Sequence, residues 1–235
     1  MIKVRLRFSK TGPLRYIGHL DFLKVFQQTI RRAGLPMAYS QGFNPHMQLS
    51  FALPLPVGMV SIIDYADITL ESEMPTNEIV SRFNDNAPGG LRLTSAWEFT
   101  GPGAAALVTV ADYMLVEPMD SHTGLLEKAD AIVQPLLSRE SIVIPKKTKS
   151  GVKDTDIRPD ILDISVEGYG INSDSYNVNI LMRLAAGSGR FLNPIIVAKL
   201  LTGRDIDTTS IVRMDLYGTN DKKELVSLYE PPIYK

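Results

Sequence analysis

The strict alternation at the start of the chain constrains its fold most strongly. Apolar and basic side chains alternate without interruption, in the order Ile2, Lys3, Val4, Arg5, Leu6, Arg7 and Phe8. A period of two is typical of a strand that buries one face. The sequence therefore predicts a first strand over residues 2–8, with the cations on the face opposite the core.

A helix is predicted next, because the apolar spacing changes from two to three and four. The apolar stripe is Leu20, Leu23, Phe26, Ile30 and Ala33. Asp21 falls in the first turn, where the positive end of the helix dipole favours an acid. Gly34 and Pro36 follow the last apolar position, as expected after a helix C-terminus.

The same reasoning predicts α+β architecture for the rest of the chain. In the first half, strands over 47–53, 61–70 and 91–99 surround a helix that we expect Thr76 to cap. In the second half, strands are predicted over 112–117, 141–145, 160–166, 176–184 and 211–217. Helices are predicted over 125–137 and from Asn193 to Gly203, with Asn193 as cap.

The order β-α-β-β-α-β is that of a ferredoxin-like unit, whose two helices cover one face of an antiparallel sheet. We therefore expect tandem ferredoxin-like modules with antiparallel sheets. The first spans residues 1–100 and contains the basic recognition segment, and the second spans 110–235.

Composition excludes several kinds of chemistry. The 235 residues include no cysteine, so the chain has no disulfide, thiolate zinc site or cysteine nucleophile, and no iron–sulfur cluster that it ligates itself. The longest apolar runs are too short to span a bilayer, and the N-terminus does not resemble a secretion signal. We expect a cytoplasmic protein with no membrane partner.

Charge is unevenly distributed along the first half. Residues 1–60 hold eight Lys or Arg against one acid, a net charge of +7, whereas residues 61–120 hold two Arg against ten acids, a net charge of −8. Such a division suggests one surface that faces a polyanion. We expect the functional surface to lie mainly in the basic segment, defined here as residues 15–50.

Two of the three histidines, His19 and His46, fall in the basic segment, and His122 lies elsewhere. His19 is predicted at the start of a helix, where the dipole favours a neutral imidazole that can act as a base. The alternative is a purely structural role, as a cap or in packing on the first strand. The candidate binding residues are Arg15, His19, Asp21, Lys24, Arg32, Ser40, Phe43, Asn44 and His46.

Residues 40–46 form a predicted recognition loop, rich in turn-forming and polar residues. Phe43 can stack on a nucleobase, and the glycine and asparagine can present backbone and amide groups to a ligand. The alternative is an ordinary turn with Phe43 packed in the core.

Three further segments carry weaker signals. The lysines at 146, 147, 149 and 153 can bind phosphates, although such a run is more often a solvated loop. The acids at 154, 156, 160 and 163 lack EF-hand spacing, so no metal site is expected. Residues 187–190 precede a helix without the ending of a P-loop. No catalytic triad, carboxylate pair or zinc signature is recognisable.

Several motifs together resemble the bacterial radical-SAM-linked (radical-SAM-associated) domain family. They are Arg5-Leu6-Arg7-Phe8-Ser9-Lys10, Gly12, Arg15-Tyr16-Ile17-Gly18-His19-Leu20-Asp21, Arg32-Ala33-Gly34-Leu35-Pro36, Tyr39-Ser40-Gln41-Gly42-Phe43-Asn44-Pro45-His46, Leu49-Ser50-Phe51-Ala52 and Met182-Arg183-Leu184-Ala185-Ala186-Gly187-Ser188. The resemblance implies a partner with a radical S-adenosylmethionine domain and a cobalamin-type domain. That partner would carry the iron–sulfur cluster, S-adenosylmethionine and cobalamin, and this chain would bind no cofactor.

The expected function is therefore that of an accessory, substrate-binding module for a separately encoded radical-SAM protein, in contact with RNA or a ribosome-related macromolecule. One alternative is a metal-independent RNA-processing endonuclease, with His19 as general base and Arg15 or Lys10 stabilising the phosphorane. A second is a protein–protein adaptor. The sequence favours a chain without catalytic activity of its own.

Overall fold

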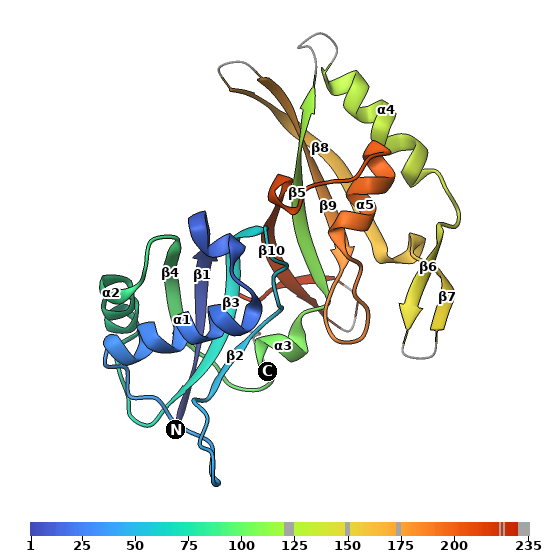
Figure 1. The fold of residues 1–235 in the computed structure, drawn as a ribbon. Coiled ribbons are helices and arrows are strands. Elements are labelled where there is room, and N and C mark those ends of the chain that lie inside the picture. Colours follow the sequence, from blue (N-terminus) through green and yellow to red (C-terminus); the bar gives the residue numbers. More distant parts are fainter. Residues whose placement is uncertain (120–124, 149–150, 173–174, 221, 223, 230–235) are drawn as a thin grey trace.

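A computed structural model describes residues 1–119, 125–148, 151–172, 175–220, 222 and 224–229. The fold is mixed α/β, with one large, mostly antiparallel sheet and five helices in the described part of the chain (Figure 1). The main path of the sheet runs β4-β1-β3-β10-β5-β9-β8, with β2 paired to β3 and β11 to β10. Its strands are β1 (Ile2–Lys10), β2 (Leu49–Phe51), β3 (Val60–Leu70), β4 (Leu91–Glu98), β5 (Val110–Met119), β8 (Ile161–Asn172), β9 (Ser175–Ala185), β10 (Ile211–Thr219) and β11 (Leu225–Ser227).

The first half (residues 1–100) packs two helices, α1 (His19–Arg32) and α2 (Thr76–Asn86), on one face of β4, β1 and β3 (Figure 1). The predicted alternation in β1 is confirmed, because Val4, Leu6 and Phe8 are buried in this core. Phe8 meets the rings of Phe22, Phe26 and Phe51 with centroid separations of 5.3–5.9 Å. These apolar contacts fix the position of α1, and with it the basic segment.

The second half (residues 110–235) repeats the strand order of the first. Without the β6–β7 hairpin and β11, each half has four strands, which we number in chain order. Across the sheet they follow the order fourth, first, third, second in both halves: β4-β1-β3-β2 in the first and β10-β5-β9-β8 in the second. Its helices are α4 (Leu125–Leu137) and α5 (Pro194–Thr202). The predicted ends of α5 are confirmed: the Asn193 side chain accepts from the Ile195 N–H, and Gly203 takes a left-handed φ of 71°.

The two halves join through a parallel strand pair. Val60 and Ser61 of β3 lie opposite Val212 and Arg213 of β10, so the sheet continues from one half into the other. Within each half the neighbouring strands pair antiparallel, as expected, but this parallel pair joins the two expected sheets into one. The paired residues are about 150 positions apart in the sequence, and no local pattern encodes such a pairing.

Residues 141–156 also differ from expectation. The strand predicted over 141–145 belongs to a separate two-stranded hairpin, β6 (Val143–Thr148) and β7 (Gly151–Asp156), outside the main sheet. Lys146, Lys147 and Lys153 therefore lie on strands, while Lys149 is outside the described residues. Alternation is weak here because a two-stranded hairpin does not have one uniformly buried face.

Two smaller points complete the fold. Thr76 does not cap α2: Pro75 holds the N-cap position, and no side chain bonds there. The connector after Gly101 includes a short helix, α3 (Ala104–Leu107). Within the described residues, no helix combines the length and apolar character needed to cross a membrane.

Candidate recognition surface

The 40–46 loop is closed at its base by main-chain and side-chain hydrogen bonds. Ser40 N–H donates to His46 O at 2.8 Å, and His46 N–H donates to Ser40 Oγ at 2.9 Å. Tyr39 and Met47 form an isolated β-bridge directly below. The chain between these bonds therefore projects from the body as a closed loop.

Phe43 lies at the far end of this loop with its side chain fully exposed, at 107 % of the reference area. The alternative in which Phe43 packs in the core is therefore wrong. Asn44 and His46 are exposed as well. Gly42 allows the turn by adopting a φ of 125°, which L side chains rarely take. The phenyl ring is therefore accessible to another molecule, on the kind of exposed loop that often carries binding residues.

A groove of about 390 Å³ lies beside the base of the loop. Its polar lining includes Lys3, Ser40, His46, Gln48, Ser50 and Thr69. Asp67 also lines it, but its carboxylate already accepts from Arg5 Nε at 2.7 Å and from Ala104 N–H at 2.6 Å. The groups left to meet a ligand are therefore mainly the Lys3 ammonium, the His46 imidazole and the neutral hydroxyls.

His19 is separate from this loop, in the first turn of α1. Its exposed imidazole meets the ring of Phe51 edge-on, with centroids 5.7 Å apart. Gly18, not His19, is the N-cap of the helix. Asp21 and Lys24 form an exposed ion pair one turn further on, at 3.0 Å, and such a pair adds little stability.

Arg15 has a structural role. Its Nε donates to Gly58 O at 2.6 Å and its Nη2 donates to Thr209 O at 2.7 Å, so the guanidinium ties the start of the basic segment to the second half. Lys10 is also engaged: its ammonium is buried and donates to Ile17 O at 3.3 Å. Burial lowers the pKa of Lys10, and the nearby Asp64 carboxylate opposes that change.

The binding of Arg15 and Lys10 bears directly on the endonuclease alternative. Both cations proposed to stabilise a phosphorane donate hydrogen bonds to backbone carbonyls, and neither is free in this structure. Arg32 lies at the opposite end of the 14-residue α1, about 20 Å from His19. Its Nη2 donates to Asn86 O at 2.9 Å.

The positive charge of the first sixty residues is thus only partly at the surface. Lys3, Lys24, Arg31 and Arg32 are exposed. The other four cations, Arg5, Arg7, Lys10 and Arg15, are buried or half-buried. The structure brings Ser40 and His46 together and leaves Phe43 and Asn44 on the same loop. Arg15 precedes α1, His19 is its first residue and Arg32 its last.

A buried ion pair at the junction was not predicted. Arg213 of β10 has no exposed area and forms an ion pair with Asp64 of β3, which is 4 % exposed. Arg213 also donates to Leu53 O at 3.1 Å and to Pro54 O at 3.2 Å. Burial raises the pKa of Asp64, although Arg213 and Lys10 favour its charged form. The available signal was weak, because both strands hold a second charged residue, Asp67 in β3 and Asp215 in β10.

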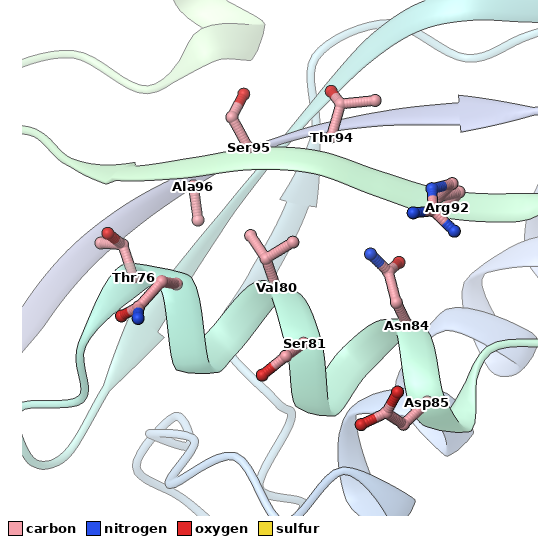
Figure 2. Close-up of a pocket in the computed structure, with 10 residues that line it drawn as sticks. Thr76, Val80, Ser81, Asn84, Asp85, Arg92, Thr94, Ser95 and Ala96 are labelled. Carbon is pink, nitrogen blue, oxygen red and sulfur yellow. The ribbon is translucent and has the colours of Figure 1, made fainter.

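A second groove, of about 590 Å³, lies between α2 and the edge strand β4 (Figure 2). Figure 2 shows Asn84 pointing from the helix toward the strand. Its amide donates to Leu93 O at 2.9 Å, and its carbonyl accepts from Leu93 N–H at 2.8 Å. The Asn84 side chain thus bonds the C=O and N–H groups of Leu93, which a further strand at this edge of the sheet could otherwise bond. None of the predicted binding residues lines this groove.

Among the residues that the structure describes, no group of three or more His, Asp or Glu side chains is placed to hold a metal ion. His122 lies outside the described residues.

One protein family matches the chain. A family model described as "Uncharacterized protein conserved in bacteria (DUF2344)" matches residues 3–194. The chain belongs to this family. The matched range of the DUF2344 family includes the basic segment, the 40–46 loop and the groove beside it. No curated protein matches the sequence.

Proposed function

We propose that this DUF2344 protein is a binding module that contacts RNA through the 40–46 loop and the groove beside it. The observation that carries the proposal is the fully exposed phenyl ring of Phe43 on a loop closed by Ser40 and His46. Exposed aromatic rings on polar loops bind single-stranded nucleic acid by stacking on its bases.

The surroundings of the loop support RNA as the ligand. Lys3 and His46 line the adjoining groove, where an ammonium and an imidazole can meet a phosphate. Lys24, Arg31 and Arg32 add exposed cations along α1. A neutral or apolar small molecule would have no negative group to pair with these cations.

The role of the module is to present its ligand to a separate radical-SAM enzyme. This part of the proposal rests on the motif resemblance and on the lack of cysteine in the chain, because the reactive cofactors would then belong to the partner. We propose further that each half is a ferredoxin-like unit, which the repeated strand order supports. The endonuclease alternative is not proposed, since Arg15 and Lys10 have other partners.

The test measures binding of a fluorescein-labelled 16-nucleotide oligouridine by anisotropy at low salt. Phe43→Ala should weaken binding by about 5- to 150-fold, the range expected for loss of one stacked base. Phe43→Tyr should retain most of the affinity, because it keeps the aromatic face. Leu162→Ala is the matched control, since it shortens an exposed apolar side chain on β8.

The control and the unfolding curves separate binding from folding. All three variants should unfold at the same urea concentration as the wild type, because neither side chain is packed in the core. An oligouridine affinity unchanged in Phe43→Ala would remove the loop from the proposal. A wild-type protein that binds no RNA at low salt would refute RNA as the ligand.

A further inference from the structure

The β6–β7 hairpin stands out from the body as a separate two-stranded arm (Figure 1). Among the described residues, its strands pair with each other and with no strand of the main sheet. A lone two-stranded hairpin is marginally stable in water. Some other feature must therefore hold this arm in place.

The base of the arm is fixed by hydrogen bonds that involve Asp156 and Arg158. Asp156 Oδ1 accepts from Ile142 N–H at 2.8 Å and from Arg158 N–H at 3.0 Å. The Arg158 guanidinium in turn donates to the carbonyls of Leu137, Arg139 and Ile161 at 3.0–3.1 Å. These bonds bind the start of the arm to the end of α4 and to β8.

Two lysines face each other further out on this arm. Lys146 of β6 is the direct cross-strand partner of Lys153 of β7, so both side chains project from the same face. Both are exposed, and neither has an ion-pair partner within the described ranges. Like charges directly opposite each other destabilise a strand pair. The protein thus keeps an unfavourable pair on the outer part of the arm, beyond Ile144, which packs against the main core.

We infer that the β6–β7 hairpin is a second contact for nucleic acid, in which Lys146 and Lys153 bind the phosphate backbone. This inference rests on the proposed RNA-binding function and adds a site on the other half of the molecule. A polyanion relieves the repulsion between the two ammonium groups and releases counterions when it binds. The exposed Val143 and Val152 lie on the opposite face of the hairpin and leave the lysine face to the phosphates.

The decisive variant is Lys153→Glu, because it should change stability and binding in opposite directions. Glutamate at 153 faces Lys146 and replaces a repulsive pair by an attractive one. The free protein should therefore unfold at a higher urea concentration. Binding of the 16-nucleotide oligouridine should fall at least about tenfold, since one phosphate contact becomes a repulsion.

The double variant Lys146→Ala/Lys153→Ala measures the number of contacts. The slope of log affinity against log salt concentration should decrease by about 1.4, which corresponds to two phosphates on a single strand. Lys222→Glu is the matched control: it makes the same charge change at an exposed lysine on the segment between β10 and β11. Its affinity should change much less than that of Lys153→Glu.

The outcomes separate this inference from the proposed function. Loss of affinity in Lys153→Glu with normal binding by Phe43→Ala supports the hairpin and removes the loop. The reverse pattern overturns the hairpin and keeps the loop. Equal losses in Lys153→Glu and Lys222→Glu would show a general charge effect and overturn the inference. A wild-type protein that binds no oligouridine would also overturn the inference. This includes a protein that binds an acidic protein instead.

Discussion

The junction between the halves and the 40–46 loop use polar residues in opposite ways. At the junction, Arg15 donates to one carbonyl of the other half and Arg213 to two, and Arg213 also pairs with Asp64. In the loop, Asn44 and His46 remain exposed. The difference teaches that residue type alone did not separate structural cations from exposed polar groups in the basic segment. Burial and hydrogen-bond partners did.

The largest effect should come from breaking the junction at Asp64. Asp64→Ala leaves the fully buried Arg213 without its counter-charge, and loss of one partner of a buried pair costs about 3–5 kcal/mol. Urea unfolding followed by circular dichroism measures this loss. The double variant Asp64→Leu/Arg213→Met should be more stable than the single variant, because it removes both charges. A single variant within about 1 kcal/mol of the wild type would mean that Arg213 finds other compensation.

A smaller loss is expected at Gly58, where the first half packs against Thr208 of the second. Gly58 has a φ of 94°, and a Cβ there would lie 1.8 Å from Thr208 Oγ1. Gly58→Ala should cost about 2–4 kcal/mol from steric overlap and backbone strain together. Gly89→Ala is the control, since nothing lies within 4 Å of its added Cβ, and its stability should change by less than about 0.5 kcal/mol.

The overlap itself has a separate check. Thr208→Ala removes the nearest atom, Oγ1, so Gly58→Ala/Thr208→Ala should recover part of the loss measured for Gly58→Ala alone. No recovery would indicate that the positive φ, or the remaining contact with the Cβ of residue 208 at 2.9 Å, sets the cost. Either way, the result tells how tightly the two halves depend on this approach.

Local patterns predicted the elements of the fold well, and long-range pairing much less. The alternation that starts at Ile2 and the Asn193 and Gly203 ends of α5 are confirmed because each depends on residues close in sequence. The pairing of Val60 with Val212 leaves no such signature. The hairpin was missed for a related reason: its strands contact each other and do not bury a continuous apolar face.

The candidate site was predictable in part. The loop composition predicted a turn, because glycine, asparagine and proline favour one, but it left both exposure and core packing of Phe43 open, and the structure shows the ring exposed. Arg15 looked equally suited to binding, but its partners Gly58 and Thr209 are far away in sequence. A count of cations in the sequence therefore overstates the surface charge when some of them bond carbonyls that are distant in the sequence.

On the loop side of the comparison, Ser40→Ala should have a modest effect. The substitution removes the Oγ that accepts from His46 N–H, a bond worth about 0.5–1.5 kcal/mol. Because the loop lies outside the core, we expect faster hydrogen exchange of the His46 amide with little change in global unfolding. Ser50→Ala is a suitable control, since it removes an exposed hydroxyl that lines the same groove. Unchanged exchange at His46 would mean that the Ser40 N–H bond to His46 O closes the loop alone.

The smallest effect is expected at Asp156. Unlike the junction and the loop, it is a carboxylate near the surface that accepts hydrogen bonds from backbone N–H groups of the chain. The N–H groups of Ile142 and Arg158 hold the pKa of Asp156 below its ordinary value of 3.8, and the Ile142 bond is the larger cause. A lowered pKa in the folded state means that the ionised form stabilises the protein. That contribution is complete above the ordinary pKa and is lost as the pH falls through the lower folded value. Asp156→Asn should therefore have a lower urea midpoint than the wild type at pH 7, and the gap should narrow as the pH falls below about 4. A difference in urea midpoint that stays constant with pH would show that the charge of Asp156 does not stabilise the fold. The hydrogen bonds of Asp156 would then resemble the neutral bonds of the 40–46 loop, and not the ion pair at the junction.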